Sequence, residues 1–339
     1  MSRPKQLLRL THPELNMLQE AVGRISQVVG GDSVFIATSE ALRAPISEAS
    51  LVAAARLFVE PLRRNTLGAL AWTSAQLISM FPKDWAGISI AVVTADHKIG
   101  DQDRFLKDVA AAMDLAEETG GLVTLGIKPT RAETGFGYIE VNATQPVSAN
   151  AFHAKSFREK PESAIAELYV RSGSFLWNSG MFFWTLGAFF NVLEEVQPEV
   201  ADCVLQMAQC LTAQDFVGAE ALFATLPNLS IDYSVMEKAP NVYVVQADFP
   251  WDDVGSWDAL ERALPTDDEG NVLSGNVIHV DTHDSIVLND SEAMTTCVLG
   301  LSDVVVVTTQ DAVLVCPKSR AQEIRRIVAE LKERGSQTL

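Results

Sequence analysis

The chain has 339 residues, 47% of them hydrophobic and 21% charged, which is enough apolar material for about two globular domains. Its formal net charge of −18 excludes a general nucleic-acid-binding protein, because such a protein needs a basic surface. No apolar run reaches the roughly 18 residues that span a bilayer, and the N-terminus has no signal-peptide core. The expected protein is therefore cytoplasmic and binds neither nucleic acid nor membrane.

The cysteines and histidines do not predict a metal site. No two cysteines form a C-x-x-C pair, and their spacings match no zinc pattern, so free buried thiols are expected. They are Cys203, Cys210, Cys297 and Cys316. His279 and His283 lie in a strand-rich region without a second ligand pair nearby in the sequence.

Strands and helices are predicted to alternate along the first half of the chain. Thr11 and Glu14 form a capping box, and apolar residues at 3-4-3-4 spacing predict a helix that ends at Gly30-Gly31. Further elements are predicted in this order: a buried strand over 33–38, a helix over 48–57, a strand over 57–60, a helix from about 66 to 80, a strand from residue 90, a helix over 102–118 and a strand over 122–127. This alternation favours a doubly wound, mostly parallel sheet.

The run that begins at Ile90 ends abruptly in Thr94-Ala-Asp-His-Lys98. Its small and β-branched residues predict a strand that is buried on both faces. Ligands of open α/β sheets bind beyond the carboxyl ends of the strands, and Asp96 lies at that place. A carboxylate there can hold Mg²⁺, which usually arrives with phosphates. The alternative is an Asp that caps the following helix.

Two turns have the composition of ligand-binding turns. The basic turn at residues 60–66 precedes a helix, which suits an anion, although a solvated loop would look the same. The Gly-rich turn at residues 134–138 allows the backbone to approach a ligand or another strand closely.

The second half of the chain has three further features. Residues 175–184 are dense in aromatic side chains around Asn178, which predicts either a buried strand with a bulge or an aromatic wall with an amide aimed at a sugar hydroxyl. Helices follow over about 187–225, a helix starts at residues 230–238, and residues 249–257 form a turn with Asp252 and Asp253. From Gly270, short β-branched runs and a helix over 319–334 predict coils of a β-helix with a closing helix.

Taken together, these stretches resemble the bacterial mannose-1-phosphate guanylyltransferases, a group of sugar-phosphate nucleotidyltransferases. The matching segments run in family order over nearly the whole chain: Arg3 to Gln6, residues 60–66, Thr94 to His97, Gly126 to Pro129, Thr134 to Tyr138, Phe157 to Pro161, Trp177 to Trp184, Ser230 to Lys238 and Trp251 to Trp257. The resemblance implies a Rossmann-like, doubly wound, mostly parallel nucleotidyltransferase domain over residues 1–265. A small β-rich, β-helix-like domain with a closing helix is implied over residues 266–339.

The reaction implied by the resemblance converts GTP and mannose 1-phosphate to GDP-mannose and pyrophosphate. The sugar phosphate is its own nucleophile, so no Ser-His-Asp or Cys-His arrangement is required, and none is found in the sequence. The chemistry needs in-line alignment of the reactants and neutralisation of phosphate charge, for which Mg²⁺ is the implied cofactor. A homodimer is one oligomeric state that the sequence leaves open.

The resemblance also assigns roles to individual residues. Asp96 and Asp253 would bind magnesium, with Asp252 as the competing candidate, and Lys5 would contact phosphates. Residues of the nucleotide side would be Arg64, Asn65 and Thr66. Residues of the sugar phosphate side would be Gly137, Glu159, Lys160 and Asn178. The residues that read guanine are not identified.

Family members begin with a buried strand and a Gly-rich phosphate-binding loop, and this sequence shows neither. One explanation is a start codon placed too late, and the other is a truncated relative. The set of remaining site residues favours the first explanation. Two other functions stay open: a different sugar-1-phosphate nucleotidyltransferase, and a non-catalytic paralogue that binds sugar nucleotides.

Overall fold

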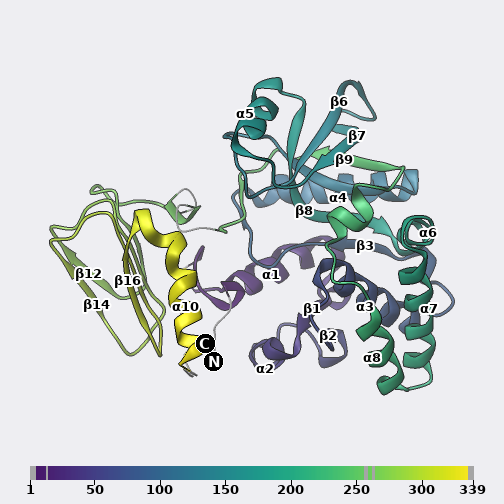
Figure 1. Ribbon diagram of the computed structural model, residues 1–339, viewed down its shortest axis with the longest axis horizontal. Coiled ribbons are helices and arrows are strands. Elements are labelled where there is room, and N and C mark those ends of the chain that lie inside the picture. The colour runs from purple at the N-terminus through teal and green to yellow at the C-terminus, as the bar shows by residue number, and fades with distance from the viewer. Residues whose placement is uncertain (1–4, 13, 256–258, 262–263, 335–339) are drawn as a thin grey trace. The chain divides into compact units, whose positions relative to one another are not determined.

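The computed structural model describes residues 5–12, 14–255, 259–261 and 264–334. The chain forms two compact units (Figure 1). Unit 1 comprises residues 1–23, 95–100 and 250–339, and unit 2 comprises residues 24–94 and 101–249. The domain boundary at residue 265 stays a prediction.

Unit 2 is built on a six-stranded sheet with strand order β3-β8-β5-β9-β7-β6, in which β6 also pairs with β8. The strands are β3 (Ser89–Val92), β5 (Leu122–Ile127), β6 (Tyr138–Pro146), β7 (Ala151–Arg158), β8 (Phe175–Thr185) and β9 (Val242–Gln246). β5 and β9 run parallel, and the other pairings of this sheet are antiparallel. The predicted mostly parallel sheet is therefore wrong, because β6 and β7 form a hairpin and β8 returns antiparallel to β3, β5 and β6.

Strand β3, which precedes Asp96 in the sequence, was predicted to be buried on both faces. It lies instead at an edge of the sheet, and all four of its residues are half-buried. Strand β5 shows the predicted pattern, because all six of its residues are buried. Apolar, β-branched sequence alone does not distinguish an edge strand from a central one.

Helices cover the sheet of unit 2. Helix α4 (Gln102–Thr119) packs against β3, β5, β8 and β9. Its N-cap is Asp101, whose side chain accepts a hydrogen bond from the Arg104 N–H, and its C-cap is Gly120 in the left-handed conformation. A cluster of buried hydrophobic residues joins the sheet to four further helices. They are α3 (Asn65–Met80), α6 (Leu186–Val196), α7 (Pro198–Thr212) and α8 (Phe216–Thr225). These helices and α4 confirm the predictions for residues 66–80, 102–118 and 187–225.

The N-terminal helix α1 (Met17–Val29) ends before Gly30 as predicted, but its cap differs. The Asn16 and Gln19 side chains each accept a hydrogen bond from the other residue's backbone N–H at 2.9 Å, which is a capping box. Thr11 instead bonds to the Glu20 side chain. The predicted box at Thr11 and Glu14 is therefore wrong, and α1 starts later.

The segment between α1 and α3 is organised differently from the prediction. Strands β1 (Ile36–Ser39) and β2 (Leu57–Glu60) form a separate two-stranded parallel sheet. β1 alternates between buried and exposed residues, so it is not the fully buried strand expected. The helix lies at α2 (Glu40–Glu48) rather than over 48–57, while the strand predicted over 57–60 is confirmed.

The C-terminal part of unit 1 consists of stacked short strands. β11 (Val272–Ser274), β13 (Ile286–Asn289) and β15 (Val304–Thr308) pair in parallel, as do β12 (Val277–Val280) and β14 (Thr296–Leu299). Val287, Val298 and Val306 pack together in the interior. Antiparallel strand β16 (Val313–Pro317) and helix α10 (Ile324–Glu333) follow. The predicted β-helix-like part with a closing helix is confirmed.

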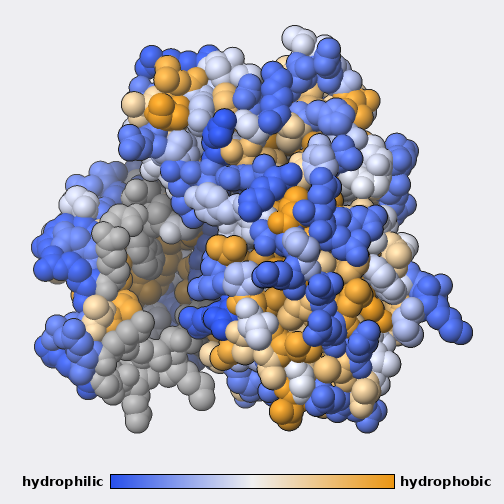
Figure 2. All heavy atoms as spheres, turned by 45° about the vertical axis from the view of Figure 1, so that its right-hand side comes forward, coloured by the Kyte–Doolittle hydropathy of each residue, from blue (hydrophilic) through white to orange (hydrophobic). Residues whose placement is uncertain are grey.

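The surface of the described part is consistent with the composition. Figure 2 shows hydrophilic groups over much of the face displayed. Among the described residues, no helix combines the length and apolar character needed to cross a bilayer. The four cysteines are free, but Cys203 is buried and Cys297 is exposed, so the expectation of buried thiols holds only in part.

We expect Gly126→Ala to destabilise unit 2. A Cβ atom at this position in β5 would lie 2.6 Å from Val244 Cγ1 and 2.9 Å from Leu176 Cβ, so neighbouring strands would have to shift. Overpacking of this kind costs about 1–3 kcal/mol, which chemical denaturation would measure. The control is Gly87→Ala, where a Cβ meets nothing within 4 Å. Equal stability of the two variants would contradict the packing of β5.

Candidate active site

Lys5, Asp96 and Asp253, predicted to act together, lie side by side in unit 1. The Lys5 ammonium group donates to the main-chain carbonyl oxygen of Asp253 at 2.6 Å and lies 3.4 Å from Oδ2 of Asp96. The Gln6 amide also lies 3.4 Å from that Asp96 oxygen. One cation therefore links two residues that are far apart in the sequence.

A short antiparallel pairing brings the two Asp segments together. β4 (Lys98–Ile99) pairs with β10 (Trp251–Asp252), with Lys98 opposite Asp252 and Ile99 opposite Trp251. The indole N–H of Trp251 donates to His97 Nδ1 at 3.1 Å. The long-range contact between the Asp96 and Asp253 segments, which the sequence could only suggest, is thus built by two-residue strands.

The same pairing separates the roles of Asp252 and Asp253. Asp252 lies beside Lys98, and burial lowers the pKa of Lys98 while the charges of Glu20 and Asp252 oppose that effect. Asp253 Oδ1 accepts the Gly255 N–H at 3.0 Å, and its main-chain carbonyl accepts from Lys5. Of the two aspartates, Asp253 is therefore the one that contacts Lys5, which also contacts Asp96.

The residues around Lys5 fit a magnesium ion by their chemistry. Carboxylate and main-chain carbonyl oxygens are the hard ligands that Mg²⁺ takes, and Asp96 and Asp253 supply both kinds on neighbouring segments. Lys5 also lies in the wall of a cavity of about 1150 Å³ in unit 1, so its ammonium group is accessible to a ligand.

A second group of predicted residues comes together in unit 2, where β6 pairs with both β7 and β8. Gly137 precedes β6, Glu159 and Lys160 follow β7, and Asn178 lies within β8. The Gly137 carbonyl accepts the Asn178 N–H at 2.8 Å, and the Phe136 carbonyl accepts the Lys160 N–H at 3.2 Å. A Cβ atom on Gly137 would lie 2.5 Å from Glu159 Oε2 and 3.4 Å from Asn178 Cβ, so a side chain at this position would displace the Glu159 carboxylate.

The charges of this group are partly paired. The Lys160 ammonium lies 3.2 Å from Glu159 Oε1, with the Lys160 side chain 63% exposed and that of Glu159 only 14% exposed. Lys160 has a positive φ of 46°. An exposed cation therefore lies beside a half-buried carboxylate, and the assignment of Lys160 to phosphate and Glu159 to sugar stays a prediction.

Asp232 is a member of this group that the sequence did not single out. Its Oδ1 accepts a hydrogen bond from Asn178 Nδ2 at 2.7 Å. Burial and the charge of Glu159 raise the pKa of Asp232, and the Asn178 hydrogen bond opposes them. Burial and Glu159 also raise the pKa of Glu237. Asp232 lay within the Ser230 to Lys238 motif, but an Asp at a helix start usually signals a cap.

Arg64 is the N-cap of α3, and Asn65 and Thr66 are its first two residues. All three side chains have protein partners, and Asn65 Oδ1 accepts the Thr66 N–H at 2.8 Å. Arg64 Nη2 donates to the Ala224 carbonyl of α8 at 2.6 Å. Thr66 Oγ1 accepts the Ile231 N–H at 2.8 Å. Asn65 has a positive φ of 57°. These contacts fix residues 224–231 against α3, and a role of the turn at the nucleotide stays a prediction.

Glu60, at the end of β2, is a carboxylate whose surroundings favour the protonated form. Burial raises its pKa from 4.5 to about 7, and the charge of Arg63 partly opposes this. Glu60 is the first residue of the family-matching segment 60–66, but the resemblance assigned no role to its carboxylate.

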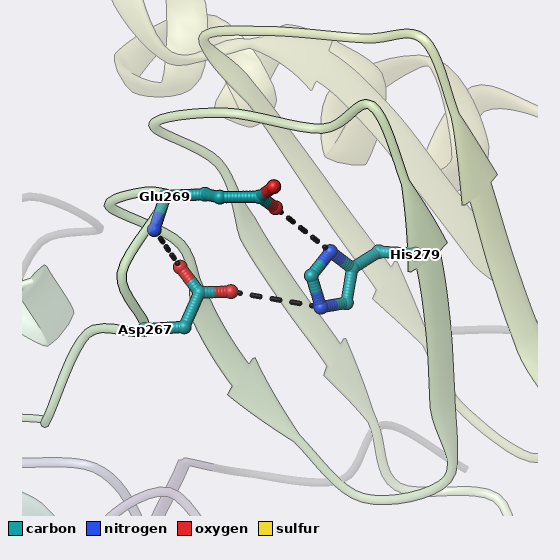
Figure 3. Close-up of side chains that lie close together, drawn as sticks. All are labelled: Asp267, Glu269 and His279. Carbon is teal, nitrogen blue, oxygen red and sulfur yellow. Dashed lines mark hydrogen bonds and ion pairs between the residues drawn. The ribbon is translucent and has the colours of Figure 1, made fainter.

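A third cluster, Asp267, Glu269 and His279, lies in the β-helix-like part (Figure 3). Asp267 Oδ2 lies 3.6 Å from His279 Nε2, while Glu269 Oε2 lies 3.5 Å from His279 Nδ1. Burial would raise the pKa of Asp267, but hydrogen bonds from Asn271 and Glu269 and the charge of His279 hold it below its usual value. Because the carboxylates face opposite ring nitrogens at ion-pair distances, this arrangement suits an imidazole flanked by two carboxylates better than one shared metal ion.

Comparison with known proteins assigns nearly the whole chain to two family models. Residues 1–270 match the family model described as nucleotidyl transferase. The chain belongs to the nucleotidyl transferase family. Residues 275–331 match a second model, the MannoseP isomerase/GMP-like beta-helix domain. Together they confirm the predicted fold class, a Rossmann-like α/β domain followed by a β-helix-like part.

Named members of the nucleotidyl transferase family resemble the chain along its length. A mannose-1-phosphate guanylyltransferase of Escherichia coli K12 is 36% identical over 340 residues, covering 98% of this chain and 70% of the relative. The alginate biosynthesis protein AlgA of Pseudomonas aeruginosa is 32% identical over 337 residues, covering 98% of this chain and 68% of the relative.

A solved structure agrees with the sequence relatives. The protein from Thermus thermophilus, described as a mannose-1-phosphate geranyltransferase, superposes with a TM-score of 0.82 at 32% identity. The match covers 98% of this chain and 97% of the Thermus chain. The resemblance to the guanylyltransferases and the enzyme class, a nucleotidyltransferase, are confirmed. Of the family motifs, Arg3, Pro4, Ser256 and Trp257 lie outside the described residues.

We expect Glu60→Gln to change the pH dependence of stability. The native pKa is near 7 and the ordinary value is 4.5, so the folded state binds the proton more tightly and the free energy of unfolding falls as pH rises from about 4.5 to 7. The variant removes this slope and is more stable at pH 8 by about 1 kcal/mol, a figure reduced for solvent screening. Denaturation at several pH values measures it.

The matched control is Glu220→Gln on α8, an exposed carboxylate. It should leave the free energy of unfolding nearly unchanged across the same pH range. A Glu60→Gln variant with the wild-type slope would contradict the buried state of Glu60.

Proposed function

We propose that this nucleotidyl transferase converts GTP and mannose 1-phosphate to GDP-mannose and pyrophosphate. The observation that carries the proposal is the contact of Lys5 with both Asp96 and Asp253 in unit 1. The names of its guanylyltransferase relatives support the choice of substrates. Gly137, Glu159, Lys160 and Asn178, which lie together in unit 2, are called the sugar-side group below. They support a sugar phosphate as the second substrate.

The sugar phosphate is the nucleophile, because a phosphate with a second pKa of about 6 is mostly dianionic near neutral pH. One of its oxygens attacks the α-phosphorus of the nucleotide, and the bond from that phosphorus to the pyrophosphate breaks on the opposite side. The protein's part is alignment and charge neutralisation, so no side chain needs to act as a nucleophile.

Each group of residues has a defined part in this proposal. Lys5 contacts the phosphates of the nucleotide, and Asp96 and Asp253 hold Mg²⁺, which supplies positive charge near those phosphates when bound. In unit 2, Lys160 contacts the phosphate of the sugar, and Glu159 and Asn178 bind its hydroxyl groups. Gly137 lets the main chain approach the ring. The turn Arg64-Asn65-Thr66 shapes the nucleotide side.

The test of the proposal is pyrophosphate release from a matrix of nucleotides and sugar phosphates with Mg²⁺. We expect the highest kcat/KM for GTP with mannose 1-phosphate, and loss of turnover when a chelator removes the metal. A preference for another nucleotide or another sugar 1-phosphate would replace these substrates by that pair. Binding without pyrophosphate release in every combination would identify a non-catalytic binding protein.

Asp253→Asn should lower kcat by at least tenfold, since it removes one anionic ligand from the proposed metal site. The concentration of Mg²⁺ needed for half-maximal activity should rise, and the melting temperature should stay within a few degrees. Titration of activity with Mg²⁺ measures both effects.

The control is Asp252→Asn, at the neighbouring carboxylate that lies beside Lys98. It should leave the Mg²⁺ dependence near that of the wild type. If the Asp252 variant alone loses its response to Mg²⁺, the assignment of Asp253 as the metal ligand is wrong.

A further inference from the structure

The amide of Asn178 is held in one orientation by its neighbours in unit 2. Its Nδ2 donates to Asp232 Oδ1 at 2.7 Å, and its Oδ1 accepts the Gly180 N–H at 3.2 Å. A backbone N–H can only donate, so the amide atom that faces Gly180 must be an acceptor. The nitrogen must therefore face Asp232 and the oxygen must face Gly180.

These contacts decide what Asn178 can offer a ligand. The Thr124 hydroxyl lies 3.3 Å from Asn178 Oδ1 and donates to the Met181 carbonyl at 2.9 Å, so the oxygen side of the amide is enclosed by protein. An Asn amide has two N–H groups, and Asp232 takes one. Among the residues that the structure describes, the second N–H of Asn178 has no hydrogen-bond acceptor.

Asp232 is itself fixed in place. It begins a π-helical turn, Asp232–Met236, and its carbonyl accepts the Glu237 N–H at 2.9 Å. The preceding residue, Ile231, donates its N–H to Thr66 Oγ1 at 2.8 Å. The carboxylate of Asp232 is therefore supported from α3.

Glu159 provides the opposite polarity beside Asn178. Both side chains border Gly137, as the contacts of a Cβ atom placed there show. An ionised Glu159 accepts hydrogen bonds, while the remaining N–H of Asn178 donates one. A hydroxyl group can do both, so this acceptor and donor fit the hydroxyls of a sugar.

We propose that Asp232 is a positioning residue, which turns the Asn178 amide so that Asn178 donates to a hydroxyl of the sugar phosphate while Glu159 accepts from one. This inference rests on the proposed function, because it takes a sugar phosphate as the ligand of this group. Asp232 does not touch the sugar and acts through Asn178.

The first experiment is a double-mutant cycle with Asn178→Ala and Asp232→Leu, read by calorimetric binding of mannose 1-phosphate and by steady-state kinetics. Either variant should weaken sugar phosphate binding by about tenfold or more, the effect of one lost hydrogen bond to a buried group. The KM for GTP should change by less than about twofold. The double variant should bind no more weakly than Asn178→Ala alone, because both changes remove the same contact.

Two further variants separate positioning from a general structural role. Asp232→Asn keeps an acceptor for Asn178 Nδ2 and should restore binding to within about threefold of the wild type. The reversed pair, Asn178→Asp combined with Asp232→Asn, keeps a hydrogen bond between the two residues but gives position 178 an acceptor in place of a donor. It should keep its melting temperature and lose sugar phosphate binding.

The possible results distinguish this inference from the proposed function. If wild-type protein binds no sugar phosphate, the proposed function fails. If wild-type protein binds it and the effects of Asn178→Ala and Asp232→Leu multiply, Asp232 acts independently and the inference is overturned. Full binding by the reversed pair would also overturn it. Should Asp232→Leu not fold, the reversed pair and Asp232→Asn still decide the question.

Discussion

Strand β8 constrains the rest of unit 2, because it pairs with three strands and carries a polar residue in an apolar run. It is hydrogen-bonded to β3, β5 and β6, and Phe183 and Trp184 are almost wholly buried. A polar group in such a strand must find partners within the protein. Gly180, with φ of 69°, and a register shift between Thr124 and Gly126 interrupt the regular ladder beside Asn178. The interruption lets the Asn178 amide reach Asp232 instead of facing the core.

The two groups of candidate residues differ in their electrostatics. In unit 1, the Lys5 ammonium lies between the Asp96 carboxylate and the main-chain carbonyl of Asp253, so positive charge is held by two acceptors. In unit 2, Asp232 and Glu237 have raised pKa values because burial and Glu159 disfavour their ionised forms. A chain with a net charge of −18 repels anionic substrates at long range. Under the proposed function, affinity for phosphates therefore comes from short-range contacts with single cations, for which Lys5 and Lys160 are the proposed residues.

The sequence predicted what depends on local pattern. Periodicity located α3, α4 and the helices from α6 to α8, and β-branched runs located the stacked strands after Gly270. The ordered motifs also brought Gly137, Glu159, Lys160 and Asn178 into one prediction, and the structure places these four together. Strand direction was not predictable, because a buried apolar run reads the same in a parallel or an antiparallel sheet.

Other features depended on contacts that no local pattern records. The cap of α1 moved from Thr11 to Asn16, since His12 Nδ1 accepts the N–H groups of Glu14 and Leu15 and so competes for the first turn. The proposed role of Asp232 depends on its hydrogen bond with Asn178, which is 54 residues away in the sequence. Glu60 looked ordinary until its burial was known. Residues whose chemistry comes from a partner far along the chain were the ones that sequence reasoning missed.

The discontinuity of unit 1 has a consequence for biosynthesis. Lys5, Asp96 and Asp253 come from its three separate segments, one from each. A ribosome adds residues from the N-terminus at about 5–20 per second. Asp96 therefore exists for roughly 8 to 30 seconds, and Lys5 for roughly 12 to 50 seconds, before Asp253 is made. All of unit 2 has been synthesised by then. The group formed by Lys5, Asp96 and Asp253 is therefore assembled late. A nascent or C-terminally shortened chain that stops before residue 250 contains the complete sugar-side group. It lacks Asp253, the carboxylate that completes the proposed metal site.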